Sequence, residues 1–224
     1  MIAIQTKMRD DLIEAEKLKQ QLSLNLLQQQ VNPHFLYNTL DNICALAELD
    51  EKETLIQLVM NLSSFYRSSL SNGKTHISIG QELEISRAYL EILQIRYFHK
   101  FDFTITCPEA LKNYSCIKLL LQPILENSIY HGIKGLDRHG ILHIEAEDAG
   151  DCIRFTISDN GRGFSKEDYE KIWQQDADHF GIKSIQQRIL LYYGPGYGLS
   201  MESPQTGGCI TVITLPKQEG LPCH

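Results

Sequence analysis

IRFTISDNGRGF, residues 153–164, runs from a β-strand directly into a glycine-rich turn. Apolar and polar residues alternate over residues 153–157, which predicts a strand with one buried face. The motif D-x-G-x-G follows, formed by Asp159, Gly161 and Gly163. An aspartate at the end of a strand can accept a hydrogen bond from an exocyclic amine such as that of adenine, and the glycines let a ligand approach the backbone. A hairpin turn is the simpler alternative, since Asp, Asn and Gly are common turn residues.

The rest of the chain from residue 73 onward alternates short strands with helices. Strands are predicted at residues 76–79, 101–106, 141–147, 152–158, 199–203 and 209–215. Helices are predicted between them, at about residues 81–98, 117–132, 166–173 and 181–193. Residues 73–224 are therefore expected to form an α+β sandwich, in which helices cover one face of a mixed sheet.

Residues 1–72 have a helical pattern instead. Residues 5–48 contain no glycine and a single proline. Apolar residues recur there at coiled-coil spacing, at Met8, Leu12, Ala15, Leu22 and Leu26, with Lys19 as a polar exception. A charged turn at residues 48–54 precedes a second apolar stripe, which ends near Ser71-Asn72-Gly73. A lone helical hairpin cannot bury its apolar stripe, so we expect a homodimer that forms a four-helix bundle.

Composition and charge argue against several classes of protein. The 21 basic and 28 acidic side chains give a net charge of −7, which argues against nucleic acid as the main partner. The longest nearly apolar stretch, residues 117–125, is shorter than the ~20 residues of a membrane span. The six cysteines form neither a C-x-x-C pair nor a cluster with zinc spacing, so we expect a reducing cytoplasm.

A second motif surrounds a proline inside a helical pattern, in the stretch QQQVNPHFLYNTL, residues 28–40. Pro33 lacks the N–H that would bond to the carbonyl of Gln29, so we predict a kink. His34 follows it, and Asn38 lies one turn later on the same face. Neutral imidazole is a good nucleophile near pH 7, but a surface histidine beside a kink is the favoured interpretation of this segment alone.

A third motif is the apolar helical pattern LLLQPILENSIYHG, residues 119–132. Glu126, Asn127 and His131 are polar positions in this pattern, and buried polar groups need partners. A metal-bound phosphate and an internal hydrogen-bond network explain them equally well. Further along the chain, Gly181 opens a predicted helix whose first N–H groups could hold phosphate.

The order and spacing of these segments together resemble the cytoplasmic kinase core of the LytS/YesM-type sensor histidine kinases. That family's sequence boxes have counterparts here: the phosphoacceptor box at residues 32–38, the N box at 121–132, and the first and second glycine boxes at 159–163 and 181–194. The resemblance covers about residues 25–217, which is nearly the whole chain.

The resemblance implies two domains. Residues 1–72 would form a helical hairpin for dimerisation and histidine phosphotransfer, and residues 73–224 would form an ATP-binding domain of the GHKL (Bergerat) type. It also implies ATP and Mg²⁺ as cofactors, with Asp159 on the adenine amine and Asn127 on the metal. The remaining ATP-binding candidates are His131, Gly161, Gly163, Gly181 and Arg188.

The resemblance also implies a reaction and a location. His34 would take the γ-phosphoryl group of ATP and pass it to an aspartate on the receiver domain of a response regulator. Two further hypotheses follow from helical spacing and from the position beside Asn127: Asn38 orients the imidazole, and Glu126 serves as an acid–base group. Kinases of this type usually sit below sensory segments, so we expect the cytoplasmic domain of a membrane sensor, joined to the membrane only through segments absent from this chain.

Three positions depart from the family's boxes. His179 replaces the first glycine of the second glycine box, Tyr130 stands where a Lys or Arg often faces phosphate, and Cys209 stands where threonine is common. These changes leave a degenerate kinase, acting as a nucleotide-binding or partner-binding module, as the alternative. An ATP-hydrolysing machine of the gyrase or mismatch-repair kind ranks last. Those families carry a glutamate four residues before the metal asparagine, and here that residue is Pro123.

Overall fold

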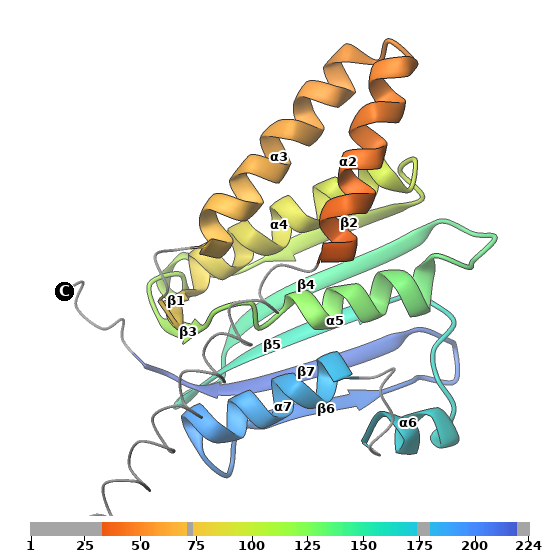
Figure 1. The fold of residues 1–224 in the computed structure, drawn as a ribbon. Coiled ribbons are helices and arrows are strands. Elements are labelled where there is room, and N and C mark those ends of the chain that lie inside the picture. Colours follow the sequence, from red (N-terminus) through yellow and green to blue (C-terminus); the bar gives the residue numbers. More distant parts are fainter. Residues whose placement is uncertain (1–32, 71–73, 174–179, 219–224) are drawn as a thin grey trace, which may run out of the picture. The chain divides into compact units, whose positions relative to one another are not determined.

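The computed structural model describes residues 33–70, 74–173 and 180–218 (Figure 1). It divides into two compact units, one ending at Leu49 and one beginning at Asp50. The predicted coiled-coil positions from Met8 to Leu26, and His179, lie outside the described residues. Within the described part of the chain, no helix is both long enough and apolar enough to span a membrane.

The first unit contributes one described helix, α2, which spans Pro33–Glu48. His34 and Asn38 lie one turn apart in it; His34 is exposed and Asn38 is half-buried. Proline suits the first turn of a helix, because the N–H groups there have no intrahelical partner. The kink that we predict at this proline involves Gln29, so it lies outside the described residues.

A mixed five-stranded sheet forms the core of the second unit. Its strands, in spatial order, are β2 (Phe101–Thr106), β4 (Gly140–Asp148), β5 (Cys152–Asp159), β7 (Cys209–Pro216) and β6 (Gly198–Glu202). β2 and β4 run parallel, and the other neighbouring pairs are antiparallel. A separate ribbon pairs β1 (His76–Ser78) with β3 (Ser115–Ile117). The predicted α+β class with a mixed sheet is confirmed.

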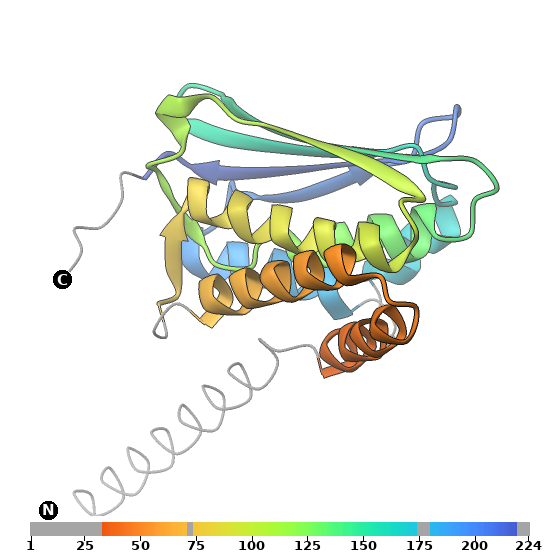
Figure 2. The ribbon, with the colours of Figure 1, turned by 90° about the horizontal axis from the view of Figure 1, so that it is seen from above.

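Helices cover one face of this sheet (Figure 2). They are α4 (Ile79–Arg96), α5 (Gln122–Asn127), the π-helical turn η3 (Ser128–Ile133) and α7 (Phe180–Tyr193), while α6 (Lys166–Trp173) lies near one end and the short η2 (Glu109–Leu111) joins β2 to β3. Alternation along β5 buries Ile153, Phe155 and Ile157 and leaves Arg154 exposed on the other face. The core therefore lies between the sheet and the helices.

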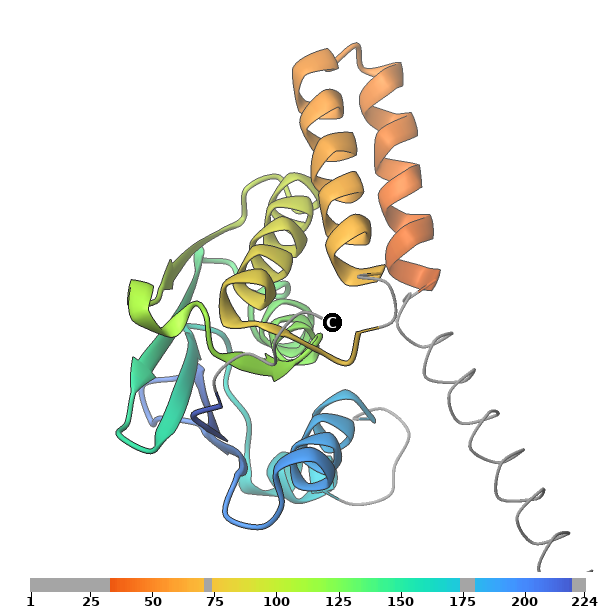
Figure 3. The same cartoon turned by 90° about the vertical axis from the view of Figure 1, so that its left-hand side faces the viewer.

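The helix α3 (Lys52–Leu70) packs against α4 (Figure 3). Phe65 of α3 is buried, and its ring centroid lies 5.8 Å from that of Tyr89 on α4. Aromatic contacts at this separation stabilise a helix pair beyond the area that they bury. The second predicted helix is thus part of the compact unit that contains the sheet.

A reciprocal cap at Ser78 fixes the beginning of α4. The Ser78 hydroxyl accepts a hydrogen bond from the Gln81 N–H at 3.2 Å, and the Gln81 side chain accepts one from the Ser78 N–H at 3.1 Å. Two backbone donors that the helix itself cannot satisfy are thereby paired. This cap explains why α4 begins two residues earlier than the apolar pattern predicts.

Replacing Ser78 with alanine is expected to lower the free energy of unfolding by about 1 kcal/mol, because the Gln81 N–H loses its acceptor. Urea unfolding followed by circular dichroism measures the change. The matched control is Ser63→Ala at an exposed position within α3, where alanine is the better helix former. A Ser78→Ala variant as stable as this control would contradict the role of the cap.

The helix predicted at residues 117–132 is wrong in its first part. β3 continues to Ile117, and residues 118–121 form a loop, called here the 118–121 loop, in which Leu119 has a φ of +55°. α5 begins only after this loop, at Gln122, and continues beyond Asn127 as η3. The apolar run gave no indication of the break, because the groups that hold the loop come from distant parts of the chain.

Candidate functional site

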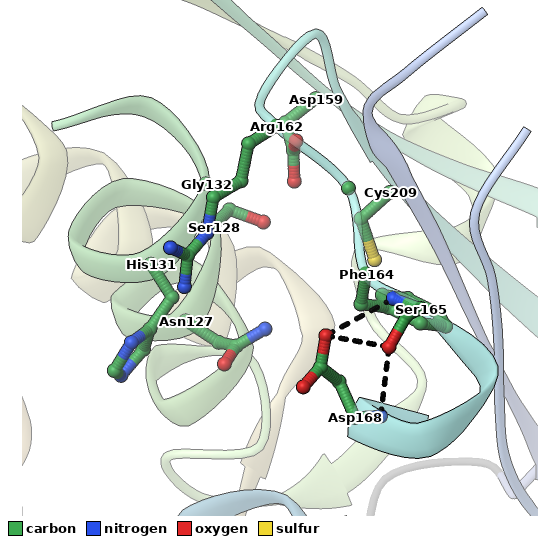
Figure 4. A pocket seen from close by; sticks show the side chains of 11 residues that line it. Asn127, Ser128, His131, Gly132, Asp159, Arg162, Phe164, Ser165, Asp168 and Cys209 are labelled. Carbon is green, nitrogen blue, oxygen red and sulfur yellow. Dashed lines mark hydrogen bonds between the residues drawn. The ribbon is translucent and has the colours of Figure 1, made fainter. Parts of the chain in front are cut away.

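A pocket of about 570 Å³ lies between α5–η3, the end of β5 and the segment that leads into α6 (Figure 4). Its lining residues are Asn127, Ser128, His131, Gly132, Asp159, Arg162, Gly163, Phe164, Ser165, Asp168 and Cys209. The sheet brings distant positions together, because Asp159 at the end of β5 is directly opposite Cys209 at the start of β7. Four of the predicted site residues, Asn127, His131, Asp159 and Gly163, therefore line one pocket.

Asp159 is one of the two carboxylates that line this pocket; the other is Asp168. Its Oδ1 accepts a hydrogen bond from the Gly161 N–H at 2.8 Å. Burial raises the pKa of Asp159 above its ordinary value, and the Ser128 hydroxyl and the Gly161 and Cys209 N–H groups oppose this shift. Oδ2 is also buried, but no described residue donates to it a hydrogen bond of normal geometry. A buried acceptor of this kind is suited to a donor group on a ligand.

The glycines after Asp159 let the turn pack closely onto η3. A Cβ atom on Gly161 would lie 2.6 Å from Asp159 Oδ1 and 2.7 Å from Gly132 Cα. Gly163 has a φ of +72°, a conformation that strains other residues, and lines the pocket. The Arg162 N–H donates to the Gly132 carbonyl at 3.1 Å, which ties the turn to η3. Gly161 thus serves the packing of the turn, and Gly163 serves the pocket wall.

Asn127 and Ser128 lie where α5 passes into η3. Figure 4 shows the Asn127 carboxamide directed into the pocket and the Ser128 hydroxyl close to Asp159. His131 lies one turn further on and is exposed. The pocket wall on this side is therefore polar, with an amide, a hydroxyl and an imidazole along one stretch of helix.

Two polar residues of the same stretch face α4 instead of the pocket. Glu126 accepts a hydrogen bond from Gln122 Nε2 at 3.0 Å. The pKa of Tyr89 on α4 is raised mainly by burial, and the charge of Glu126 adds to this rise. The Tyr130 hydroxyl accepts a hydrogen bond from Arg96 Nη1 at 2.9 Å. Neither Glu126 nor Tyr130 lines the pocket.

The remaining predicted site residues also lie outside the pocket lining. Gly181 is the second residue of α7, and a Cβ atom there would lie 3.3 Å from Pro123 Cβ on α5. Arg188 donates to the carbonyl oxygens of Lys118 and Leu119, at 2.6 and 3.3 Å. His34 and Asn38 belong to the other compact unit.

Comparison with known protein families covers most of the chain. A family described as "Histidine kinase" matches residues 22–101, and one described as "Histidine kinase-, DNA gyrase B-, and HSP90-like ATPase" matches residues 114–219. The chain belongs to the histidine kinases. Its matched C-terminal part is accordingly an ATP-binding domain of the GHKL type.

Curated relatives identify the type of histidine kinase. The chain is 31% identical over 210 residues to the sensor histidine kinase YesM of Bacillus subtilis, which is 94% of this chain and 36% of that protein. It is 28% identical over 201 residues to the sensor protein LytS of Staphylococcus haemolyticus, which is 87% of this chain and 34% of that protein. The predicted LytS/YesM type is confirmed. The chain spans about a third of the length of these relatives.

A solved structure shows the same fold. The catalytic domain of the histidine kinase ThkA matches with a TM-score of 0.50 and 17% identity, over 65% of this chain and 96% of that domain. At this level of identity the likeness concerns the fold alone. It agrees with the mixed sheet covered by helices on one face.

The pocket of this histidine kinase fits a nucleotide with a metal ion. The unsatisfied Asp159 Oδ2 is an acceptor for an exocyclic amine, and the Asn127 carbonyl oxygen is a ligand of the kind that Mg²⁺ accepts. Among the described residues, no three His, Cys, Asp or Glu side chains are grouped so that they could hold a metal ion. A Mg²⁺ ion here would therefore take most of its ligands from phosphate and water, as is usual for nucleotide-bound Mg²⁺.

Cys209 adds a neutral group to this kinase pocket. Burial raises the pKa of its thiol to about 11, so the thiol is uncharged at neutral pH. Its Sγ lies 3.6 Å from the Thr211 hydroxyl. The departure from threonine at this position thus leaves the charge of the pocket unchanged.

Six lining residues were not singled out as site residues from the sequence: Ser128, Gly132, Arg162, Phe164, Ser165 and Asp168. Ser165 and Asp168 begin α6 as a cap, in which the Asp168 N–H donates to Ser165 Oγ at 3.1 Å and the Ser165 N–H donates to Asp168 Oδ2 at 3.1 Å. The pattern S-x-x-D is a recognisable helix start, so this signal could have placed them. For Phe164 the sequence offers no comparable signal.

Proposed function

We propose that this chain is a protein-histidine kinase core that binds ATP with Mg²⁺, phosphorylates His34 and passes the phosphoryl group to an aspartate on a response regulator. The observation that carries the proposal is Asp159, a half-buried residue whose carboxylate has one buried and unsatisfied oxygen, in a pocket that Asn127 also lines. Membership of the histidine kinases supplies the reaction class. The division of labour between residues 1–72 and 73–224 is part of the same proposal.

In the proposed reaction, Asp159 would bind the adenine amine and Asn127 would hold Mg²⁺, which would supply positive charge to the phosphates. A ring nitrogen of neutral His34 forms a bond to the γ-phosphorus, the bond from that phosphorus to the bridging oxygen breaks, and ADP leaves with the electron pair. The imidazole proton passes to a base, for which Glu126 is the candidate, although it lies beside Asn127 and outside the pocket lining. Asn38 orients the ring. Such transfer depends on positioning and charge neutralisation rather than on covalent machinery.

Incubation of the chain with ATP labelled at the γ-phosphate tests this function. A phosphohistidine is labile in acid and stable in alkali, so we expect protein-bound label with this stability. Bound nucleotide without any label would favour the degenerate kinase instead. Steady release of inorganic phosphate without labelled protein would favour an ATP-hydrolysing machine.

The proposal includes a homodimer. α3 exposes Ile56, Val59 and Met60, of which Met60 is 67% exposed, and a second copy of a helical hairpin is the natural cover for such a stripe. Sedimentation equilibrium at about ten micromolar should therefore report a dimer. A monomer at that concentration would contradict this part of the proposal.

ATP and response regulators are cytoplasmic, so we place the chain on the cytoplasmic side of a membrane sensor.

A further inference from the structure

Two charged side chains from different helices bind the backbone of the 118–121 loop. The carboxylate of Glu82 from α4 accepts two backbone hydrogen bonds: Oε2 from the Leu119 N–H at 2.8 Å and Oε1 from the Leu121 N–H at 2.9 Å. Glu82 is fully buried. A glutamate is rarely buried in this way unless its charge is compensated by such donors.

Arg188 from α7 binds carbonyl oxygens of the same loop. Its Nη2 donates to the Lys118 carbonyl at 2.6 Å and its Nη1 to the Leu119 carbonyl at 3.3 Å. The planar guanidinium presents two donors in a fixed geometry, which lysine cannot reproduce. Burial raises the pKa of Glu82, while the backbone donors of the loop and the charge of Arg188 oppose this rise. The two opposite charges therefore stabilise each other, and both side chains bind the backbone of the same loop.

The 118–121 loop needs this support because its backbone is strained. Leu119 adopts the left-handed region, with a φ of +55°. For a residue with a Cβ this costs roughly 1–2 kcal/mol, so surrounding contacts must maintain it. α5 follows immediately, and the side chain of Leu121, which precedes its first residue, provides no cap. The hydrogen bonds from the side chains of Glu82 and Arg188 to the backbone of this loop thus determine where α5 begins.

The start of α5 sets the position of the pocket wall. α5 has six residues, and its last one, Asn127, lines the pocket together with Ser128. A displacement of the 118–121 loop would be carried along this short helix to both side chains. α7 also touches α5 near Gly181 and Pro123, so a shift of α7 would reach the same helix.

We propose that Glu82 and Arg188 are a pair of positioning residues, which place Asn127 and Ser128 for nucleotide binding through the 118–121 loop although neither side chain lines the pocket. This inference rests on the proposed function, because it concerns the affinity for ATP. It also replaces the direct role in ATP binding that the sequence suggests for Arg188.

A double-mutant cycle separates the indirect role from a direct one. We expect Glu82→Gln and Arg188→Gln each to weaken the binding of Mg²⁺–ATP, measured by calorimetry, about tenfold. The affinity of the double variant for Mg²⁺–ATP should be no lower than that of the single variant with the lower affinity, because both substitutions release the same loop. Arg188→Lys keeps the charge but loses the two-pronged geometry, so it should show much of the same loss. Glu84→Gln, at an exposed position two residues along α4, is the matched control and should bind like the original chain.

Hydrogen exchange measured by mass spectrometry on the nucleotide-free protein provides the second readout. In the variants we expect faster exchange confined to residues 118–133. An unchanged affinity for Mg²⁺–ATP in folded variants would overturn the proposal. A loss of affinity of roughly a hundredfold in the double variant would also overturn it, because it would show that the two substitutions act independently. If the original chain bound no ATP, the proposed function would fail, and unchanged exchange at residues 118–133 would refute the positioning pair separately. Should Arg188→Gln not fold, the cycle can be completed with Arg188→Lys.

Discussion

Replacing His34 with glutamine is expected to reduce transfer of phosphate from ATP to the chain to background, while ATP still binds. Glutamine keeps the size and polarity of the side chain, but its amide nitrogen is not a nucleophile. His34 is exposed on α2, in a compact unit separate from the one that contains the pocket. The substitution should therefore leave the affinity for ATP within a factor of about two. Protein-bound label after incubation with γ-labelled ATP, and calorimetric binding of ATP, measure the two effects.

The control for this variant is another exposed histidine. His143 lies on β4 and hydrogen-bonds to Thr104 on the neighbouring strand, at 2.6 Å. We expect His143→Gln to be labelled as fully as the original chain. Acid-labile label that survived in His34→Gln would show that another side chain accepts the phosphate, and the role proposed for His34 would be wrong.

Replacing Asp159 with asparagine is expected to weaken ATP binding roughly a hundredfold, which corresponds to about 3 kcal/mol. The carboxylate has one oxygen bonded to the Gly161 N–H and one that no described residue satisfies. Asparagine can keep the first acceptor, but it presents an NH₂ group where the adenine amine needs an acceptor. Calorimetry with Mg²⁺–ATP measures the loss. Asp151→Asn, in the exposed turn before β5, is the control and should leave the affinity unchanged.

The same substitution should make the folded protein more stable at neutral pH. Burial raises the pKa of Asp159 above 3.8, so the folded state binds a proton more readily than the unfolded state does. The favourable contribution of Asp159 to the free energy of unfolding is therefore present at low pH. It is lost as the pH rises through the pKa that Asp159 has in the folded state. The melting temperature of Asp159→Asn relative to the original chain should rise as the pH increases above about 4. If the melting temperatures of both proteins depended on pH in the same way, this prediction would be wrong. It would also be wrong if Asp159→Asn lost its affinity for ATP because the variant had unfolded.

The strands could be predicted because they depend on local pattern, whereas the expectation that the motifs form one site came from the resemblance to the family. Alternation identified β5, and the D-x-G-x-G motif placed Asp159 at its end, where the sheet brings it beside Cys209. The polar positions Asn127 and His131 could be assigned to one helical stretch from spacing, and the structure divides that stretch into α5 and η3. Their roles in binding stay predictions.

The error at residues 117–132 has a physical cause that a local pattern cannot contain. The run is apolar enough for a helix, but Glu82, more than thirty residues earlier, binds the backbone of the 118–121 loop and keeps Leu119 left-handed. Arg188 was expected at the nucleotide for a similar reason. Its place in the second glycine box made it an ATP-binding candidate, whereas its guanidinium in the structure donates to two carbonyl oxygens. Interactions between a side chain and a distant backbone segment leave no periodic trace in the sequence.

The position of β7 has a consequence for how the protein is made. β7 pairs with β5 on one side and β6 on the other, so the last strand among the described residues is an interior strand of the sheet. Until it has been synthesised, β5 has an open edge, and the pocket lacks the wall that contains Cys209. Open strand edges favour aggregation, so a ribosome-bound intermediate that ends before residue 209 is the most vulnerable stage of biosynthesis. Premature termination there should yield insoluble protein rather than a smaller working domain.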